Sequence, residues 1–223
     1  MAMNRPTIFV VGCGPGSAAF VTPAAGEAVA ESEVVLGSER LLDLFPESRP
    51  KQVALPPTVE PALDTIDRHS VSASVAVLVS GDPGLFSLAK AIVGRFGHDR
   101  CKIIPAVSSL QAAFARLGLE WADVRIISAH GRVPGVSVDE LAHCGKLAIF
   151  AGSRSVDQWT RQAVEATSST HRLFVCENLA LPGENVNEMS ADQFATCDLA
   201  PLTLLVLVRR DDNEAPNVNG SVI

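Results

Sequence analysis

Short apolar runs recur along the chain and alternate with segments of helical character. Within each run the apolar residues follow one another without polar alternation, which is typical of strands buried on both faces. Eight runs are predicted as strands: Thr7–Val11, Val34–Leu36, Val75–Val79, Lys102–Ile104, Val124–Ser128, Leu147–Ala151, Arg172–Cys176 and Leu202–Val208. This alternation predicts an α/β protein whose sheets are covered by helices.

Three of the intervening segments carry clear helix signals. Thr22 precedes Pro23, an N-cap followed by a proline at the first helical position. The segment Ser109–Leu117 has apolar residues at helical spacing, and Gly118 follows as a stop signal. A third helix is predicted over Ser155–Ala166, capped by its first residue.

The layout predicts two α/β domains and polar ends. A helix gives way to a connector and a new strand near Leu117–Asp123, so we expect an N-terminal domain over residues 1–118 and a C-terminal domain over residues 119–210. Residues 211–223 are polar and are predicted to form a disordered tail, like Met1–Asn4.

Composition narrows the class of protein. Eighteen basic and 25 acidic residues give a net charge of −7, which argues against broad nucleic-acid binding. No apolar run approaches the ~20 residues that span a membrane, and no signal peptide is expected, so the sequence predicts a cytoplasmic protein. The five cysteines lack CxxC spacing and share no metal-ligand pattern with the histidines. We therefore expect reduced thiols and no protein-bound metal.

Three loops that follow predicted strands are candidates for ligand binding. They are Gly12–Ser17, Ser80–Gly84 and Pro105–Ser109. Glycines let a backbone turn tightly and approach a ligand closely. Asp82 before a proline is expected to cap a helix starting near Gly84. Because loops at the carboxyl ends of buried strands form the ligand sites of α/β proteins, the three loops predict one crevice.

The first of these loops also invites a dinucleotide-binding interpretation. That fingerprint needs a third glycine at the position where this chain has Ser17. This chain also has a proline, Pro15, that the fingerprint lacks. An NAD(P)-linked oxidoreductase further requires an acidic ribose partner, and Glu33 lies near the right distance but before its strand. We keep this class as an alternative.

The combination of GxGPG, SGDPG and PAVSS resembles the tetrapyrrole methylase superfamily. Four further segments are similar to the branch that methylates precorrins in cobalamin biosynthesis: Gly37–Leu42, Gly84–Ala89, Ser109–Ala115 and Trp121–Arg132. The resemblance covers about residues 7–208. It implies two α/β domains with a cleft for S-adenosylmethionine (SAM) between them. It also implies methylation of carbon 5 of precorrin-6Y or cobalt-precorrin-7, and a homodimer.

The resemblance assigns residues position by position. Expected cofactor contacts are Gly14, Pro15, Gly16, Ser80, Gly81, Asp82, Ser108, Ser109, Ala151, Gly152 and Asn178. Asp82 is the expected catalytic residue, which orients the cofactor or takes a proton after methyl transfer. The substrate carries many carboxylates, and the expected contacts to it are Arg40, Arg132, Lys90 and His130. His130 is either a proton shuttle or a structural histidine.

Other functions remain open at this point. A methylase of the same superfamily acting on ribosomal RNA or a protein is the first alternative, and the negative charge counts against RNA. A non-catalytic sensor of adenosyl ligands is another. Some relatives fuse a second, decarboxylating methyltransferase, so the resemblance also implies a separate partner enzyme acting at carbon 15.

Overall fold

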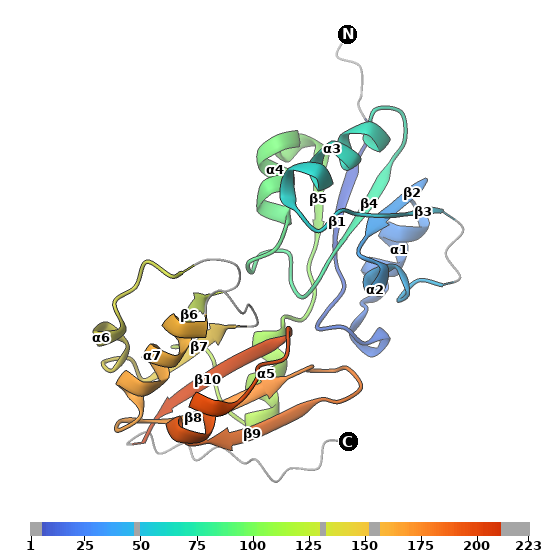
Figure 1. Cartoon of the computed structure of the whole chain (residues 1–223). Coiled ribbons are helices and arrows are strands. Elements are labelled where there is room, and N and C mark those ends of the chain that lie inside the picture. The colour runs from blue at the N-terminus through green and yellow to red at the C-terminus, as the bar shows by residue number, and fades with distance from the viewer. Residues whose placement is uncertain (1–5, 47–49, 130–132, 152–156, 211–223) are drawn as a thin grey trace. The chain divides into compact units, whose positions relative to one another are not determined.

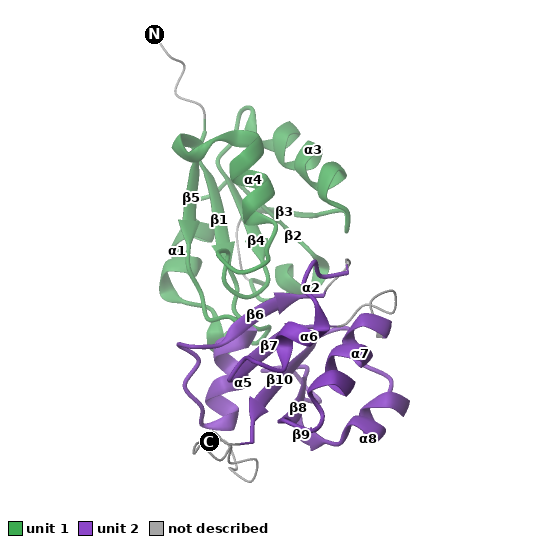
Figure 2. Ribbon diagram, turned by 90° about the vertical axis from the view of Figure 1, so that its left-hand side faces the viewer, with its two compact units in different colours: residues 1–108 green, residues 109–223 purple. Residues whose placement is uncertain are grey.

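The computed structural model describes residues 6–46, 50–129, 133–151 and 157–210. The chain forms two compact units, residues 1–108 and 109–223 (Figure 2). The division falls between Ser108 and Ser109, so the helix that the sequence analysis placed at the end of the first domain is grouped with the second unit. It contacts a strand of that unit's sheet.

The first unit is built on a parallel five-stranded sheet (Figure 1). Its strands are β1 (Ile8–Gly12), β2 (Val34–Gly37), β3 (Lys51–Ala54), β4 (Val75–Val79) and β5 (Cys101–Ile104). They lie in the order β3-β2-β4-β1-β5, and every neighbouring pair is parallel. All their carboxyl ends therefore lie at one edge.

Helices cover both faces of this sheet. The helical segments are η1 (Ala18–Phe20), α1 (Pro23–Ala30), α2 (Glu39–Leu42), α3 (Val59–Ser70), α4 (Ala89–Phe96) and η2 (His98–Arg100). Alternate strand residues face opposite cores: Phe9 and Val11 pack with α1 and α2, whereas Ile8 and Val10 pack with α3 and α4. The Thr22 cap is confirmed, because its side chain accepts a hydrogen bond from the Ala25 N–H.

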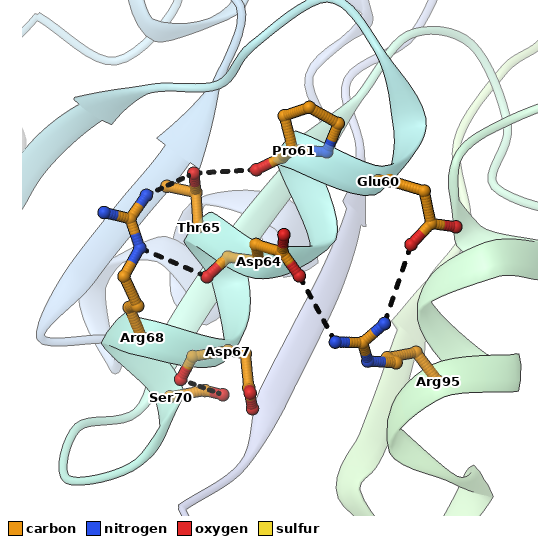
Figure 3. A network of polar contacts seen from close by, with 8 residues as sticks. All are labelled: Glu60, Pro61, Asp64, Thr65, Asp67, Arg68, Ser70 and Arg95. Carbon is orange, nitrogen blue, oxygen red and sulfur yellow. Dashed lines mark hydrogen bonds and ion pairs between the residues drawn. The ribbon is translucent and has the colours of Figure 1, made fainter.

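A polar network links α3 and α4 on the outside of the sheet (Figure 3). The Arg95 guanidinium of α4 lies 3.2 Å from the Asp64 carboxylate and 3.6 Å from that of Glu60, both on α3. These groups are largely exposed, so each ion pair adds little stability. The apolar side chains Leu63 and Ile92 beneath them supply the main attraction between helices and sheet.

The second unit contains a mixed five-stranded sheet. Its elements are α5 (Ser109–Leu117), β6 (Arg125–Ser128), α6 (Val138–Leu141), β7 (Lys146–Phe150), α7 (Asp157–Thr167), β8 (His171–Glu177), β9 (Asn185–Met189), α8 (Ala191–Thr196) and β10 (Thr203–Arg209). The order is β6-β7-β10-β8-β9; β6 and β7 are parallel and the remaining pairs antiparallel. Helices α6, α7 and α8 contribute to the core on one face.

The predicted α/β class is confirmed, and all eight predicted strands are present. The sequence analysis missed β3 and β9, both at sheet edges with largely exposed or half-buried residues. Helix α5 has the predicted bounds, and α7 confirms the third predicted helix from Asp157 onward. Ser155 and both predicted tails lie outside the described residues.

Candidate functional site

The carboxyl ends of β1 and β4 form a switch point in the first sheet. These strands are neighbours, and the chain leaves β1 toward α1 on one face but leaves β4 toward α4 on the other. Loops that diverge in this way open a crevice at the strand ends, which is where open α/β sheets bind ligands.

The two loops at this switch point are bonded to each other. The Gly81 N–H donates to the Gly14 carbonyl at 2.8 Å, and the Cys13 N–H donates to the Val79 carbonyl at 3.0 Å. Gly14 and Gly81 have φ angles of 73° and 67°, a left-handed conformation that side chains disfavour. The second glycine of GxGPG and the first glycine of SGDPG are thus required by the backbone path.

Asp82 joins the second loop to the third. One carboxylate oxygen, Oδ1, accepts the Gly84 N–H at 2.7 Å, and the other, Oδ2, accepts the Ala106 N–H at 3.0 Å. Helix α4 begins only at Ala89, so the expectation of a helix cap near Gly84 was wrong. Both oxygens of Asp82 hold backbone amides, which suits an orienting role.

Gly12 is the point where the three loops pack together. A Cβ atom added there would lie 2.7 Å from the Ala106 Cβ, 2.7 Å from the Pro83 Cδ and 3.0 Å from the Gly81 carbonyl oxygen. Ser108, the last residue of the first unit, is buried, and its Cα lies 3.9 Å from the position of a Cβ on Gly81. The predicted convergence of the three loops is therefore present.

Arg40 lies at the same edge, although it is far from the loops in sequence. Its Nη2 donates to the Ser80 Oγ at 3.3 Å, whereas its Nη1 is buried without a hydrogen-bond partner among the described residues. Burial raises the pKa of the nearby Cys13 thiol to about 12, although the positive charge of Arg40 opposes that shift. Cys13 is thus a protonated thiol and a poor nucleophile, whereas Arg40 offers a free donor to an anion.

Lys90 lines a hollow next to the second loop. The hollow has a volume of about 620 Å³ and is bounded by residues of the segments that follow β3 and β4, including Val59 and Phe86. Both of these side chains are about half exposed, and Phe86 has a φ of 48°. His130 and Arg132, the remaining expected substrate contacts, lie outside the described residues.

The expected contacts of the second unit meet at one edge of its own sheet. Ala151 follows β7 and Asn178 follows β8, and these strands run in the same direction on either side of β10. The Ala151 N–H donates to the Thr203 carbonyl at 3.0 Å and the Asn178 N–H to the Leu202 carbonyl at 3.1 Å. Gly152 lies outside the described residues.

The sequence analysis missed an ion pair behind the Asn178 loop. The Arg116 guanidinium of α5 donates to the Glu184 carboxylate, with Nε and Oε1 2.6 Å apart. The two residues are 68 positions apart, and no local pattern marks either of them. Only the packed second unit brings them together.

The dinucleotide interpretation fails on geometry. Glu33 lies at the amino end of β2, whereas a ribose partner belongs at the carboxyl end. Its carboxylate already accepts the Ser74 N–H at 3.0 Å.

In the described ranges, His, Cys, Asp and Glu form no group of three or more able to hold a metal ion. The helices of those ranges include none long and apolar enough to cross a bilayer.

Comparison with known proteins identifies the family. The family described as tetrapyrrole (corrin/porphyrin) methylases matches residues 7–195, which include the three loops of the first unit. The chain belongs to this family. The predicted resemblance is therefore confirmed at the family level, and membership also makes the chain a methyltransferase.

Similar proteins match most of this chain. The cobalt-precorrin-7 C(5)-methyltransferase of Salmonella typhimurium is 32% identical, over 80% of this chain and 88% of its own. The precorrin-6Y C(5,15)-methyltransferase [decarboxylating] of Sinorhizobium sp is 28% identical, over 92% of this chain but only 50% of its own. A crystal structure of the precorrin-6Y methylase CbiE from Archaeoglobus fulgidus has a TM-score of 0.69 and 28% identity, covering 92% and 98% of the two chains.

Proposed function

We propose that this protein transfers a methyl group from SAM to carbon 5 of a precorrin in cobalamin biosynthesis, with cobalt-precorrin-7 or precorrin-6Y as substrate. The observation that carries the proposal is the set of three bonded loops at the switch point of the first sheet, together with the buried Nη1 of Arg40, which has no hydrogen-bond partner in the described part of the chain. The names of similar proteins supply the ring position and the substrate.

The residues at the switch point fit a small cationic cofactor. Left-handed glycines at Gly14 and Gly81 bring bare backbone to the crevice, where a ligand can approach closely. The negative charge of Asp82 lies in the same loops and favours a positive charge nearby. The proposed contacts of the first unit are Gly14, Pro15, Gly16, Ser80, Gly81, Asp82 and Ser108. Those of the second unit are Ser109, Ala151, Gly152 and Asn178.

The chemistry asks the protein for alignment and exclusion of water. Bound SAM supplies a methyl group on a sulfonium, which an electron-rich ring carbon attacks directly, so no nucleophilic side chain is needed. The three loops pack closely around Gly12, which fixes them relative to one another. Correct alignment contributes up to ~7–11 kcal/mol to lowering a barrier of this kind. Asp82 acts as an orienting residue, because its two oxygens fix the second loop against the third.

Cationic side chains would hold the substrate carboxylates. Arg40 is the best placed, since a buried donor without a partner gains most from an anion. Lys90 lies at a hollow with apolar walls, a surface suited to the face of a macrocycle with acidic side chains. Arg132 and His130 complete the proposed set from the family resemblance.

The proposal extends to the oligomeric state, the location and the partners of the enzyme. We expect a homodimer in the cytoplasm, without a nucleic-acid or membrane partner. A relative is named for carbons 5 and 15, and we propose a decarboxylating methyltransferase acting at carbon 15 as a partner.

A ligand screen tests the cofactor assignment. The melting temperature is measured with SAM, S-adenosylhomocysteine, NAD⁺ and NADP⁺ in parallel. A ligand at 100 times its Kd adds ~2.7 kcal/mol, or roughly 5–10 °C for a chain of this size. The proposal expects a shift with the two adenosyl compounds alone. A shift with the nicotinamide compounds alone would overturn it.

A further inference from the structure

The loop between β8 and β9 has an unusual backbone. Asn178 and Ala180 have φ angles of 50° and 61°, and neither is glycine. An asparagine tolerates this left-handed conformation, and the Asn178 Nδ2 donates to the Gly183 carbonyl at 3.5 Å. Alanine has no side-chain bond to offset the cost. Something outside Ala180 must therefore hold it in this conformation.

The carboxylate of Glu184 provides that restraint. Its Oε2 accepts the backbone N–H of Ala180, and its two oxygens accept the Nε and Nη2 of Arg116 at 2.6 and 3.3 Å. Glu184 closes the same loop, so one carboxylate ties the strained residue to the end of the loop and to helix α5. Bidentate pairs of this kind fix orientation as well as distance.

The ion pair between Arg116 and Glu184 is strong enough to hold the loop in place. The Arg116 and Glu184 side chains are 19% and 25% exposed, so water screens them only in part. The hydrogen bond from Arg116 lowers the pKa of Glu184, with the Ala180 N–H acting in the same direction. The carboxylate is therefore charged at neutral pH and keeps both partners.

We infer that Arg116 and Glu184 are positioning residues that hold the Asn178–Gly183 loop in its ligand-binding shape. The inference rests on the proposed function, in which Asn178 contacts the cofactor. Neither residue is among the proposed cofactor or substrate contacts, and the pair acts through Ala180 and the loop. Its loss should weaken cofactor binding by releasing the strained backbone.

The chain supplies a matched control for this inference. Arg172 and Glu188 form a second bidentate pair, with distances of 2.8 and 2.7 Å, between β8 and β9. The pKa of Glu188 is also lowered by its arginine. This pair joins two strands and touches no residue of the Asn178–Gly183 loop. Glu188→Gln therefore removes a comparable ion pair without releasing the loop.

The first experiment compares Glu184→Gln and Glu188→Gln by calorimetric titration with S-adenosylhomocysteine. We expect the Kd of Glu184→Gln to rise about tenfold, equivalent to ~1.4 kcal/mol, and that of Glu188→Gln to stay within about twofold. Adding Ala180→Gly to Glu184→Gln should recover most of the lost affinity, because glycine adopts a positive φ without a restraint. Equal Kd values in the two glutamine variants would overturn the inference, as would a failed recovery.

Hydrogen exchange of the ligand-free protein separates this inference from the proposed function. Glu184→Gln should speed exchange at the Ala180 amide, and Glu188→Gln should not. If the wild type binds no S-adenosylhomocysteine, the proposed cofactor is wrong, yet the exchange rates still decide whether the pair holds the loop. Unchanged exchange in Glu184→Gln would show that the pair does not hold it.

Discussion

Replacing Asp82 with alanine removes the carboxylate that connects two of the three loops. In the wild type each oxygen accepts one backbone N–H, from Gly84 and from Ala106. Alanine leaves both amides without this partner. The Gly84 amide is exposed, so water replaces most of what it loses, whereas the Ala106 amide is partly buried.

The size of the effect follows from these two contacts. A hydrogen bond to a charged group contributes ~1.5–3 kcal/mol, and we assign that range to the Ala106 bond and less than ~1 kcal/mol to the exposed one. The free energy of unfolding should therefore fall by about 1.5–4 kcal/mol. For a chain of this size each kcal/mol lowers the Tm by ~2–4 °C. Because the loops also separate, S-adenosylhomocysteine affinity should fall at least about tenfold.

Thermal melting and calorimetric titration are measured on the same preparations. Leu63→Ala is the control, since it removes a buried side chain from the core beneath α3 at a cost of ~2–5 kcal/mol without touching the loops. Asp82→Ala should lose affinity and Leu63→Ala should not. If Asp82→Ala loses stability but keeps its affinity, Asp82 is only a structural bridge and its orienting role is refuted.

Three further predictions concern other parts of the molecule. Arg40→Gln should raise the KM for the tetrapyrrole at least about tenfold and leave the Kd for S-adenosylhomocysteine unchanged. A higher Kd for S-adenosylhomocysteine would show that Arg40 binds the carboxylate of the cofactor and not one of the substrate. Gly12→Ala should cost ~1–3 kcal/mol, because its Cβ would lie 2.7 Å from Ala106; an unchanged Tm would contradict the packing. Since the folded pKa values of Glu184 and Glu188 are lowered, their stabilisation is present above about pH 4.5 and is lost as the pH falls through the lowered values. Melting across acidic pH should show this loss in the wild type and a smaller one in either Gln variant; parallel curves would contradict it.

The core of the fold could be predicted from the sequence because its signals are local. Continuous apolar runs such as Val75–Val79 mark strands buried on both faces, and Thr22 with Pro23 marks a helix start. The edge strand Asn185–Met189 carries no such run, because one side of it has no neighbouring strand and none of its residues is fully buried. It forms by pairing with β8, the strand directly before it, and no apolar run marks it in the sequence.

The candidate site also combines features that have local sequence signals with features that depend on tertiary packing. Glycine-rich loops at strand ends can be recognised in the sequence. Their convergence can also be predicted, because the carboxyl ends of parallel strands lie at the same edge of a sheet. The contact of Arg40 with Ser80 joins positions 40 residues apart, and no spacing rule predicts it. The restraint of the strained Ala180 by Glu184 is likewise tertiary, since the position of Glu184 depends on where α5 packs.

Methyl transfer to a defined tetrapyrrole tests the central claim most directly. The protein is incubated with cobalt-precorrin-7 and SAM carrying an isotopically labelled methyl group, and the product is examined by mass spectrometry and NMR. The account predicts one labelled methyl group on carbon 5 and an equal amount of S-adenosylhomocysteine. Label on another ring carbon, or transfer only to RNA or protein in a parallel incubation, would contradict it.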